Sequence, residues 1–291
     1  MRLQTSKWRA NLSDPDLNST PGGRIPVHLF CRGCVTKRAH ARIRRIFHQP
    51  ATAVLRLNLW SGPRNVSTAL MYAFAQRSDT RVIDEPLYAH YLHVTGAQHP
   101  GREDVLASQD NNGERVVQNI LLGPCDRPVL FVKNMAHHFI DLAWSFLSQM
   151  TTIMLIRDPE QMLPSLINQV PHPQLADTAY GRQKKIFDHL CARGETPCVL
   201  DSRELLLNPR GVLSQLCAHL DLDFEDTMLR WPAGARPEEG VWAPHWYHVI
   251  HKTTGFEPYK AKTAPFPEFL EPLLKECLPY YRYLYQFAFR A

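Results

Sequence analysis

The sequence predicts an α/β fold in which helices cover both faces of a mostly parallel central sheet, giving three layers. Short apolar runs rich in Val, Leu and Ile have the composition of buried strands. Between them lie segments whose apolar residues recur every three to four positions, the period of a helix that packs on one side. Strands and helices that alternate in this way are typical of parallel sheets. The length of 291 residues and the hydrophobic content of 44% favour one core domain.

These patterns locate the strands and the helices in chain order. The apolar runs predict strands at 54–60, 81–84, 129–132, 151–156 and 198–200. The spacing of apolar residues predicts helices at 66–77, 112–122, 137–147, 160–170, 174–191 and 209–220, and a terminal docking helix at 266–278. Ligands of such sheets gather at the carboxyl ends of the strands. The residues that follow each strand are therefore the candidates for function.

The first 50 residues differ from the rest of the chain in charge and in periodicity. They hold ten Lys and Arg residues against Asp14 and Asp16, whereas the whole chain has a net charge of +5, so the remainder is slightly acidic. We expect a basic, disordered N-terminal extension over residues 1–50 and one domain over 51–291. An Arg-rich start can be a transit peptide, but the two acidic residues and the broken periodicity argue against that. A slightly acidic domain gives no reason to expect nucleic-acid binding.

The seven cysteines form no regular framework. An odd number without a pattern favours reduced thiols, and hence a cytoplasmic protein, over a disulfide scaffold. Cys31 and Cys34 are the only close pair, and a zinc site would need two more ligands at a matching spacing, so we expect no metal. No run of 18 apolar residues is present, and no transmembrane segment is therefore expected.

The first predicted strand runs into a loop and then a helix over residues 60–70, with the sequence WSGPRNVSTAL. This is the architecture of a phosphate-binding loop, because free backbone N–H groups and the helix dipole attract an anion there. No Gly-Lys pair follows Gly62, so it is not a Walker A loop. An ordinary capped helix with an exposed arginine would look similar in isolation. The expected anion-binding positions are Arg64, Asn65, Val66, Ser67 and Thr68.

The fourth predicted strand ends in a second candidate for phosphate binding. Arg157 follows the strand directly, Pro159 suits the first turn of the next helix, and Ser165 comes eight residues after Arg157. Ser165 would lie about 9 Å along the helix axis, a gap that an Arg side chain plus a bound phosphate can bridge. Taken alone, the same residues are compatible with a local salt bridge and a helix cap.

Together the two motifs resemble the sulfotransferase family, which has a P-loop NTPase-like fold. In that family the first-strand loop carries the phosphosulfate, and an Arg and a Ser eight residues apart bind the 3′-phosphate of the nucleotide. Residues 199–206 and Asn208-Pro209 resemble the family's later strand, short acidic loop and helix start. The resemblance covers roughly 55–224 and, more loosely, 241–281, and it is nearest to the bacterial and plant sulfotransferase-like branch. It implies 3′-phosphoadenosine 5′-phosphosulfate (PAPS) as co-substrate, without a metal.

The resemblance also has a departure in the loop. Many members of the family carry Lys at the position of Arg64 and Gly at the position of Val66, although carbohydrate sulfotransferases do use Arg. Arg64 keeps the positive charge and gains a forked geometry, but it is a poorer proton donor to a leaving phosphate because a guanidinium holds its proton more strongly than an ammonium. The departure leaves open a domain that binds the nucleotide without turnover.

A sulfuryl acceptor needs a general base, and two strand ends offer one. Glu85, in a Glu-Pro after the second strand, resembles an acceptor-site feature of carbohydrate sulfotransferases and is the preferred base. His137, after the third strand, is the second candidate, and the neighbouring His138 is its substitute. Each of these residues is also compatible with a capping or packing role.

The late segment 242–255 is aromatic and basic. The family places a late basic loop at the 3′-phosphate, so the resemblance implies that Lys252 and Gly255 contact the nucleotide. Clustered Trp and Tyr side chains are equally typical of a packed core. The implied acceptor is a small molecule or a carbohydrate with a hydroxyl or an amine, and nothing in the sequence predicts an oligomeric state. A P-loop kinase or nucleotide hydrolase is the alternative enzyme class.

Overall fold

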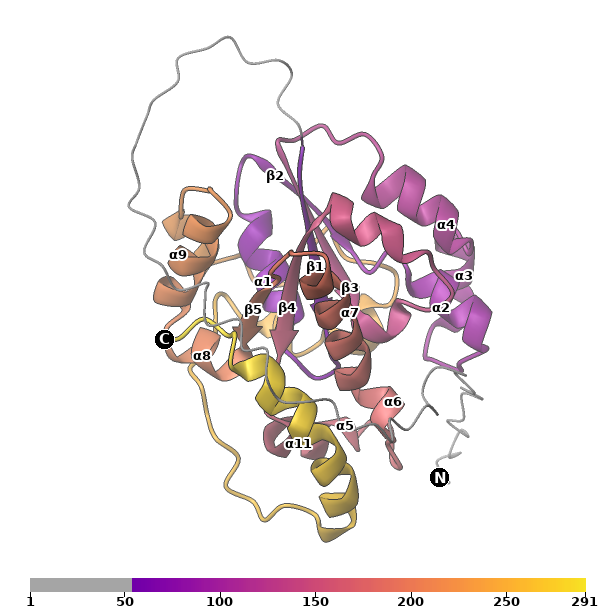
Figure 1. Cartoon of the computed structure of the whole chain (residues 1–291), viewed down its shortest axis with the longest axis vertical. Coiled ribbons are helices and arrows are strands. Elements are labelled where there is room, and N and C mark those ends of the chain that lie inside the picture. Colours follow the sequence, from indigo (N-terminus) through magenta and orange to yellow (C-terminus); the bar gives the residue numbers. More distant parts are fainter. Residues whose placement is uncertain (1–53) are drawn as a thin grey trace. The chain divides into compact units, whose positions relative to one another are not determined.

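The computed structural model describes residues 54–291, and the extension expected over residues 1–50 lies outside the described residues. Five parallel strands form one sheet in the order β2-β3-β1-β4-β5 (Figure 1). Their bounds are β1 Leu55–Ser61, β2 Thr80–Asp84, β3 Val129–Met135, β4 Thr151–Ile156 and β5 Cys198–Asp201. The five predicted strands and the three-layer α/β fold are confirmed, with strand ends that shift by a few residues.

The strand order places β1 at the centre of the sheet. The chain first moves from β1 to β2 and β3 on one side, and then to β4 and β5 on the other. Ser61, the last residue of β1, lies in register with Met135 of β3 and with Leu155 of β4. A change of direction of this kind opens a crevice at the carboxyl ends of the strands, which is where open α/β sheets bind their ligands.

The helices differ in length and type. The α-helices are α1 Ser67–Ala75, α2 Tyr88–Thr95, α3 Arg102–Ser108, α4 Gly113–Val116, α5 Pro159–Leu166, α6 Leu175–Thr178, α7 Tyr180–Ala192, α8 Ser202–Leu207, α9 Pro209–His219, α10 Ala243–Trp246 and α11 Glu271–Tyr285. A π-helix, η2, spans Val117–Leu121. Short 3-10 helices are η3 Ala136–His138, η4 Trp144–Gln149, η5 Asp226–Leu229, η6 Ile250–Lys252 and η7 Glu268–Leu270.

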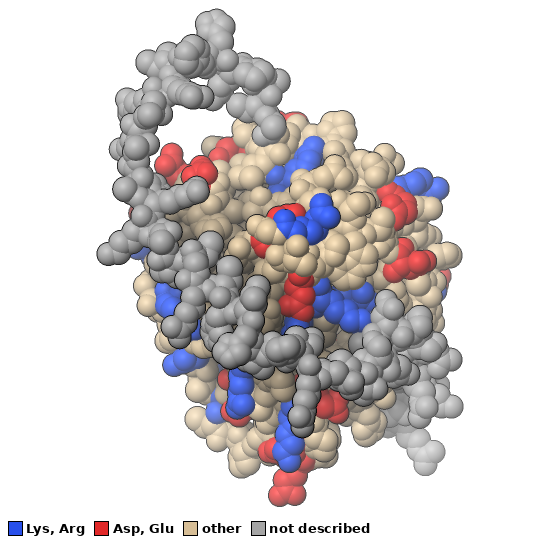
Figure 2. All heavy atoms as spheres, viewed as in Figure 1, with Lys and Arg blue, Asp and Glu red and all other residues tan. Residues whose placement is uncertain are grey.

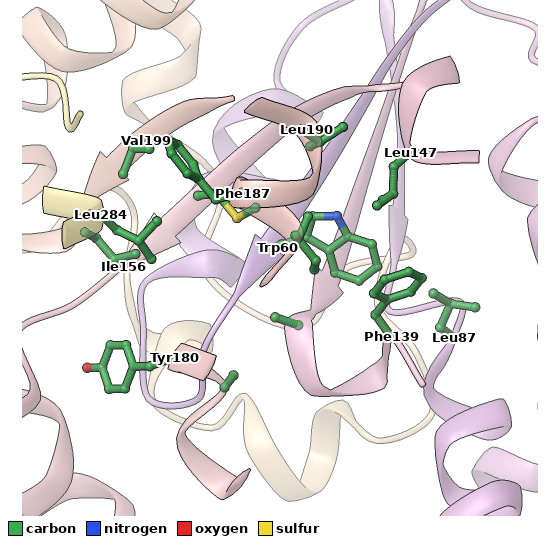
Figure 3. Close-up of a cluster of buried hydrophobic side chains, with 14 of the residues drawn as sticks. Trp60, Leu87, Phe139, Leu147, Ile156, Tyr180, Phe187, Leu190, Val199 and Leu284 are labelled. Atoms are coloured by element: carbon green, nitrogen blue, oxygen red, sulfur yellow. The ribbon is translucent and has the colours of Figure 1, made fainter. Parts of the chain in front are cut away.

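Each face of the sheet carries its own hydrophobic cluster. Leu59 and Trp60 are neighbours on β1 and belong to opposite clusters, because successive side chains of a strand point to opposite faces. Trp60 packs in the cluster that includes Phe187 of α7 and Leu284 of α11 (Figure 3). Leu59 belongs to the cluster formed with α1 and α9. Burying each such side chain contributes about 1.5–3 kcal/mol, so both layers stabilise the central strand.

Two predicted helices are wrong in detail. The helix predicted at 137–147 is replaced by η3 and η4, because Asp141 adopts a left-handed φ of 48° that a helix cannot contain. The helix predicted at 174–191 is divided at Ala179, which has a φ of 66°. The expected short loop after β5 is instead α8, whose first N–H groups are capped by Asp201.

Two properties of residues 54–291 concern the surface. None of the helices in this range is both long enough and apolar enough to cross a membrane. Lys and Arg side chains alternate with Asp and Glu on the face shown in Figure 2, without a continuous basic stripe there.

Candidate active site

The loop between β1 and α1 is held by its own asparagine. Asn65 donates from Nδ2 to the carbonyl oxygen of Leu155 at 3.0 Å, and its Oδ1 accepts from the N–H of Val66 at 2.9 Å. The hydroxyl of Ser202 in α8 also donates to Asn65 Oδ1. The preceding residue, Arg64, has a left-handed φ of 54°. Strain of this kind persists where surrounding contacts fix the backbone, and here Asn65 supplies those contacts to β4 and α8.

The N-terminus of α1 faces this loop without a capping side chain. Val66 occupies the N-cap position, makes no side-chain cap, and no acidic residue lies in the first turn. Asp158, Asp201 and Asn208 cap α5, α8 and α9, whereas α2, α7 and α11 lack a side-chain cap as α1 does. The first N–H groups of a helix need an acceptor, and the helix dipole favours a negative one. The amides at the start of α1 are therefore available for an anion.

The two anion-binding motifs of the sequence meet at Arg64. Its Nε donates to Ser165 Oγ at 3.0 Å, and its carbonyl oxygen accepts from Nη1 of Arg157 at 2.5 Å. The carbonyl oxygen of Arg157 in turn accepts from the hydroxyl of Tyr180 at 2.5 Å. The loop after β1, the end of β4 and the helix α5 thus form one cluster.

Lys262 joins the cluster from the segment before α11. Burial lowers the pKa of its ammonium, and repulsion by Arg157 and then by Arg64 lowers it further. Its backbone N–H donates to Oε1 of Gln161 in α5 at 3.0 Å. Burial also lowers the pKa of Arg64 and of Arg157, and Arg64 adds to the effect on Arg157. The charge of Arg64 thus acts on Arg157, and both arginines act on Lys262, a residue that is itself exposed.

Between residues 54 and 291, no carboxylate forms an ion pair with Arg64, Arg157 or Lys262. Elsewhere in the same range arginines are paired, as Arg77 is with Asp79 at 2.7 Å. Like charges at close range are costly unless an opposite charge joins them. The cluster and the uncapped start of α1 therefore fit a ligand with several negative charges.

A second group of polar side chains lies at the ends of β2 and β3. Lys133 of β3 lies in register with Asp84 of β2, and its Nζ donates to Asp84 Oδ1 at 2.9 Å and to Glu85. The third donor of the ammonium reaches the hydroxyl of Tyr247 at 2.7 Å. The side chain of Lys133 is 1% exposed, and burial of this kind requires paired charges. Two carboxylates therefore share one buried ammonium.

Glu85 is a buried carboxylate on a left-handed residue at the end of β2. Its φ of 39° turns the chain out of β2, and the residue is 8% exposed. Burial raises the pKa of the Glu85 carboxyl, Asp84 raises it further, and the ammonium of Lys133 acts in the opposite direction. A raised pKa makes a carboxylate more basic near neutral pH.

The two histidines after β3 lie in an aromatic cluster. The ring of His138 stacks on Tyr88 with centroids 4.9 Å apart, and His137 lies edge-on to Tyr91 at 5.1 Å. Burial lowers the pKa of His137 to about 3 and that of His138 well below its usual value. Both imidazoles are then neutral and weakly basic. Nδ1 of His138 lies 3.8 Å from Oε2 of Glu85, so His138 rather than His137 is the histidine beside the carboxylate.

Among residues 54–291, no hydrogen bond or ion pair joins Lys252 or Gly255 to Arg64, Arg157 or Ser165. Gly255 pairs with Arg230 and lines a surface pocket together with Gln76. Gln76 follows the last residue of α1, so this pocket lies at the opposite end of a nine-residue helix, about 13 Å from the loop. Lys262 is the basic residue of the late segment on which the charge of Arg157 acts. No motif spacing in the sequence distinguishes Lys262 from Lys252.

Residues 54–291 contain no group of three or more His, Cys, Asp or Glu side chains arranged to hold a metal ion. The site that the structure assembles consists of a cluster of cationic side chains at the carboxyl end of the central strands and a buried carboxylate cluster at the end of β2.

Comparisons with known proteins bear on this site. A family model described as a sulfotransferase domain matches residues 55–288. The branched-chain-amino-acid aminotransferase-like proteins 2 and 1 of Arabidopsis thaliana are 38% identical over 230 residues and 39% identical over 229 residues. Each match covers 78% of this chain and 41% of the plant protein, so the chain spans less than half the length of these relatives. The crystal structure of a sulfotransferase from Alicyclobacillus acidocaldarius has a similar fold, with a TM-score of 0.50 at 11% identity, over 80% of this chain and 95% of that one.

Proposed function

Because the chain belongs to the sulfotransferase domain family, we propose that it moves a sulfuryl group from PAPS to a hydroxyl or an amine of a small molecule or carbohydrate. The observation that carries the proposal is the gathering of Arg64, Arg157 and Lys262, without a partner carboxylate among residues 54–291, beside the uncapped start of α1. A nucleotide with phosphates at both the 3′ and 5′ positions carries the negative charge that would neutralise these cationic side chains.

Different residues of the chain would bind the 5′ side and the 3′-phosphate of the nucleotide. We propose that the amides at the start of α1, with the hydroxyls of Ser67 and Thr68, hold the 5′ side. Arg157, Ser165 and Lys262 would hold the 3′-phosphate, and a site that requires this phosphate disfavours ATP, which has none. Arg64 would connect the two halves, since it belongs to the loop before α1 and its side chain contacts Ser165.

PAPS, when bound, supplies an activated sulfuryl group on its 5′-phosphate. The Glu85 carboxylate takes the proton of the acceptor hydroxyl or amine as the acceptor atom forms its bond to sulfur. The bond between sulfur and the bridging oxygen breaks, and its electron pair stays on the phosphate of the departing nucleotide. Arg64 and the amides of α1 stabilise the charge that develops there, as in other group transfers that depend on positioning and electrostatics.

The names of the two plant relatives mention an aminotransferase. More than half of each of those proteins lies outside the matched part, so the name does not assign an activity to the domain described here. The anion-binding cluster supports sulfuryl transfer, and no observation within residues 54–291 favours amino-group transfer.

Calorimetric titration of the full chain with 3′-phosphoadenosine 5′-phosphate (PAP) tests the proposed donor site. We expect micromolar binding that ATP does not match and that Arg157→Ala weakens. The matched control is Arg81→Ala, since the Arg81 side chain is 51% exposed and, within residues 54–291, pairs only with Asp126. Equal affinity for ATP, or binding that survives Arg157→Ala, contradicts the assignment. Incubation with PAPS and a panel of alcohols, phenols, amines and sugars then separates an enzyme from a domain that only binds the nucleotide.

A further inference from the structure

The buried group at the ends of β2 and β3 contains more negative than positive charge. Asp84 and Glu85 both contact the ammonium of Lys133. The titratable side chains that face Glu85 are Asp84 from β2, Lys133 from β3, His138 from η3, Tyr88 from α2 and Tyr247 from the segment after α10. Burial keeps His138 neutral and raises the pKa values of both tyrosines, so neither the imidazole nor the phenols add a charge. One ammonium is therefore left to neutralise the charges of two carboxylates.

Asp84 receives the larger share of the hydrogen-bond donors. Its Oδ1 accepts from Lys133 at 2.9 Å, and its Oδ2 accepts from the hydroxyl of Tyr247 at 2.9 Å. The N–H of Gly240 lies 3.4 Å from the same Oδ2. The Glu85 carboxylate accepts from the ammonium and interacts with the Tyr247 hydroxyl, and His138 lies 3.8 Å away. An ammonium has three donors, and those of Lys133 are all in use.

We propose that Asp84 is a positioning residue that keeps Glu85 basic: by holding Lys133 and the Tyr247 hydroxyl, it leaves the charge of Glu85 only partly neutralised in a buried site. This inference rests on the proposed function for its catalytic meaning and assigns Asp84 a role in the same reaction. Asp84 does not touch the acceptor, and it acts through Lys133. Tyr247, which follows α10, is the residue through which this segment contacts Lys133 and Asp84.

The arrangement predicts opposite effects for two substitutions. Asp84→Asn removes a neighbouring negative charge and leaves Glu85 as the only carboxylate on Lys133, so the pKa of Glu85 falls. Tyr247→Phe keeps all three charges but removes a donor from Asp84, which then draws the ammonium away from Glu85. The Tyr247 hydroxyl itself lowers the pKa of Glu85, so its loss raises that pKa. We expect each shift to be at least about half a pH unit.

The experiment is a carbon-13 NMR titration of the full chain labelled at the glutamate carboxyl carbons, with the Glu85 signal assigned by its loss in Glu85→Gln. Asp79→Asn is the matched control, because Asp79 precedes β2 and pairs with Arg77 at 2.7 Å, away from Glu85. This control removes an equal charge and should leave the Glu85 titration unchanged. The acid limb of kcat/KM against pH, measured with the acceptor that reacts best, should move in the same directions as the NMR midpoints.

The outcomes separate the inference from the proposed function. Opposite shifts for Asp84→Asn and Tyr247→Phe support the positioning role, whereas no shift or shifts in one direction overturn it. If Asp84→Asn does not fold, an upward shift in Tyr247→Phe still supports the proposal, and an unchanged or downward midpoint overturns it. The NMR titration reads Glu85 whether or not any acceptor is sulfated. Opposite shifts without PAP binding or turnover would therefore remove the proposed function while the charge relationship stands.

Discussion

The guanidinium of Arg64 donates from Nε to the hydroxyl of Ser165 at 3.0 Å, across 101 residues of sequence. This bond joins the loop after the first strand to the helix after the fourth. It makes the two phosphate-binding motifs parts of one site, because Arg157 also donates to the carbonyl oxygen of Arg64.

Replacing Arg64 should impair turnover more than folding. Arg64→Ala removes the positive charge proposed to face the bridging oxygen, and loss of one such donor lowers kcat by about 10²-fold or more. Arg64→Lys keeps the charge but loses the planar Nε contact to Ser165, so its kcat should lie between those of wild type and Arg64→Ala. Steady-state kinetics with saturating PAPS measures the series. An unchanged kcat in Arg64→Ala would remove Arg64 from the reaction.

Gly62→Ala should weaken PAP binding by displacing the loop. A Cβ atom at Gly62 would lie 3.0 Å from the carbonyl oxygen of Thr178, which is closer than most real Cβ contacts. Because Thr178 lies at the end of α6, the loop must move and the amides at the start of α1 move with it. Gly181→Ala is the matched control, since a Cβ there has nothing within 4 Å, and alanine in a helix adds up to about 1 kcal/mol of stability. Calorimetry should show weaker PAP binding in the first variant and unchanged binding in the second.

Glu85→Gln should abolish most turnover while PAP binding persists. The amide keeps the shape of the side chain but cannot accept the acceptor's proton. Since burial raises the pKa of Glu85, wild-type kcat/KM should fall as the pH drops through that raised pKa and the carboxylate is protonated. His137→Ala should retain more activity than Glu85→Gln, because the pKa of His137 is lowered to about 3. Equal losses of activity in both variants would make His137 a candidate for the general base again.

Asp201→Asn should stabilise the protein at neutral pH. Burial raises the pKa of Asp201 to about 6, from 3.8, although it caps α8 through the N–H groups of Arg203 and Glu204. Between these values the folded state binds more protons than the unfolded state, so the contribution of Asp201 to stability decreases as the pH rises towards 6. Asparagine keeps the capping oxygen without the buried charge. Urea unfolding should show a gain of about 2 kcal/mol at pH 7 that disappears near pH 4; a gain that is independent of pH would exclude this cause.

The sheet could be predicted from the sequence because its signals are local, and Arg64, Arg157 and Ser165 became candidates through local patterns too. The strand from Leu55 to Ser61 is an apolar run, and Arg64 follows it in a loop whose residues belong together. Arg157 and Ser165 were recognisable by their separation of eight residues. Each of these features depends on neighbours in the chain, which is the information that a single sequence carries.

The parts that the sequence did not reveal depend on contacts across the fold. Lys262 lies in a segment without periodicity, and only the packing of that segment on α5 brings it near Arg157. The ion pair of Asp84 with Lys133 follows from the register of β2 and β3, and Tyr247 is 114 residues from Lys133. The helix expected at 137–147 failed because the backbone of Asp141 is left-handed, which an apolar pattern does not indicate.

The position of β1 between β3 and β4 determines which segments of the chain must stay together when this domain is joined to another protein. Since the chain leaves the centre of the sheet on one side and returns on the other, the residues of the site are contributed by segments from Arg64 to Lys262. No crossover point inside that span leaves the site complete on one fragment. A chimaera that is to keep the proposed site must therefore carry this span as a whole and should be joined outside residues 55–288.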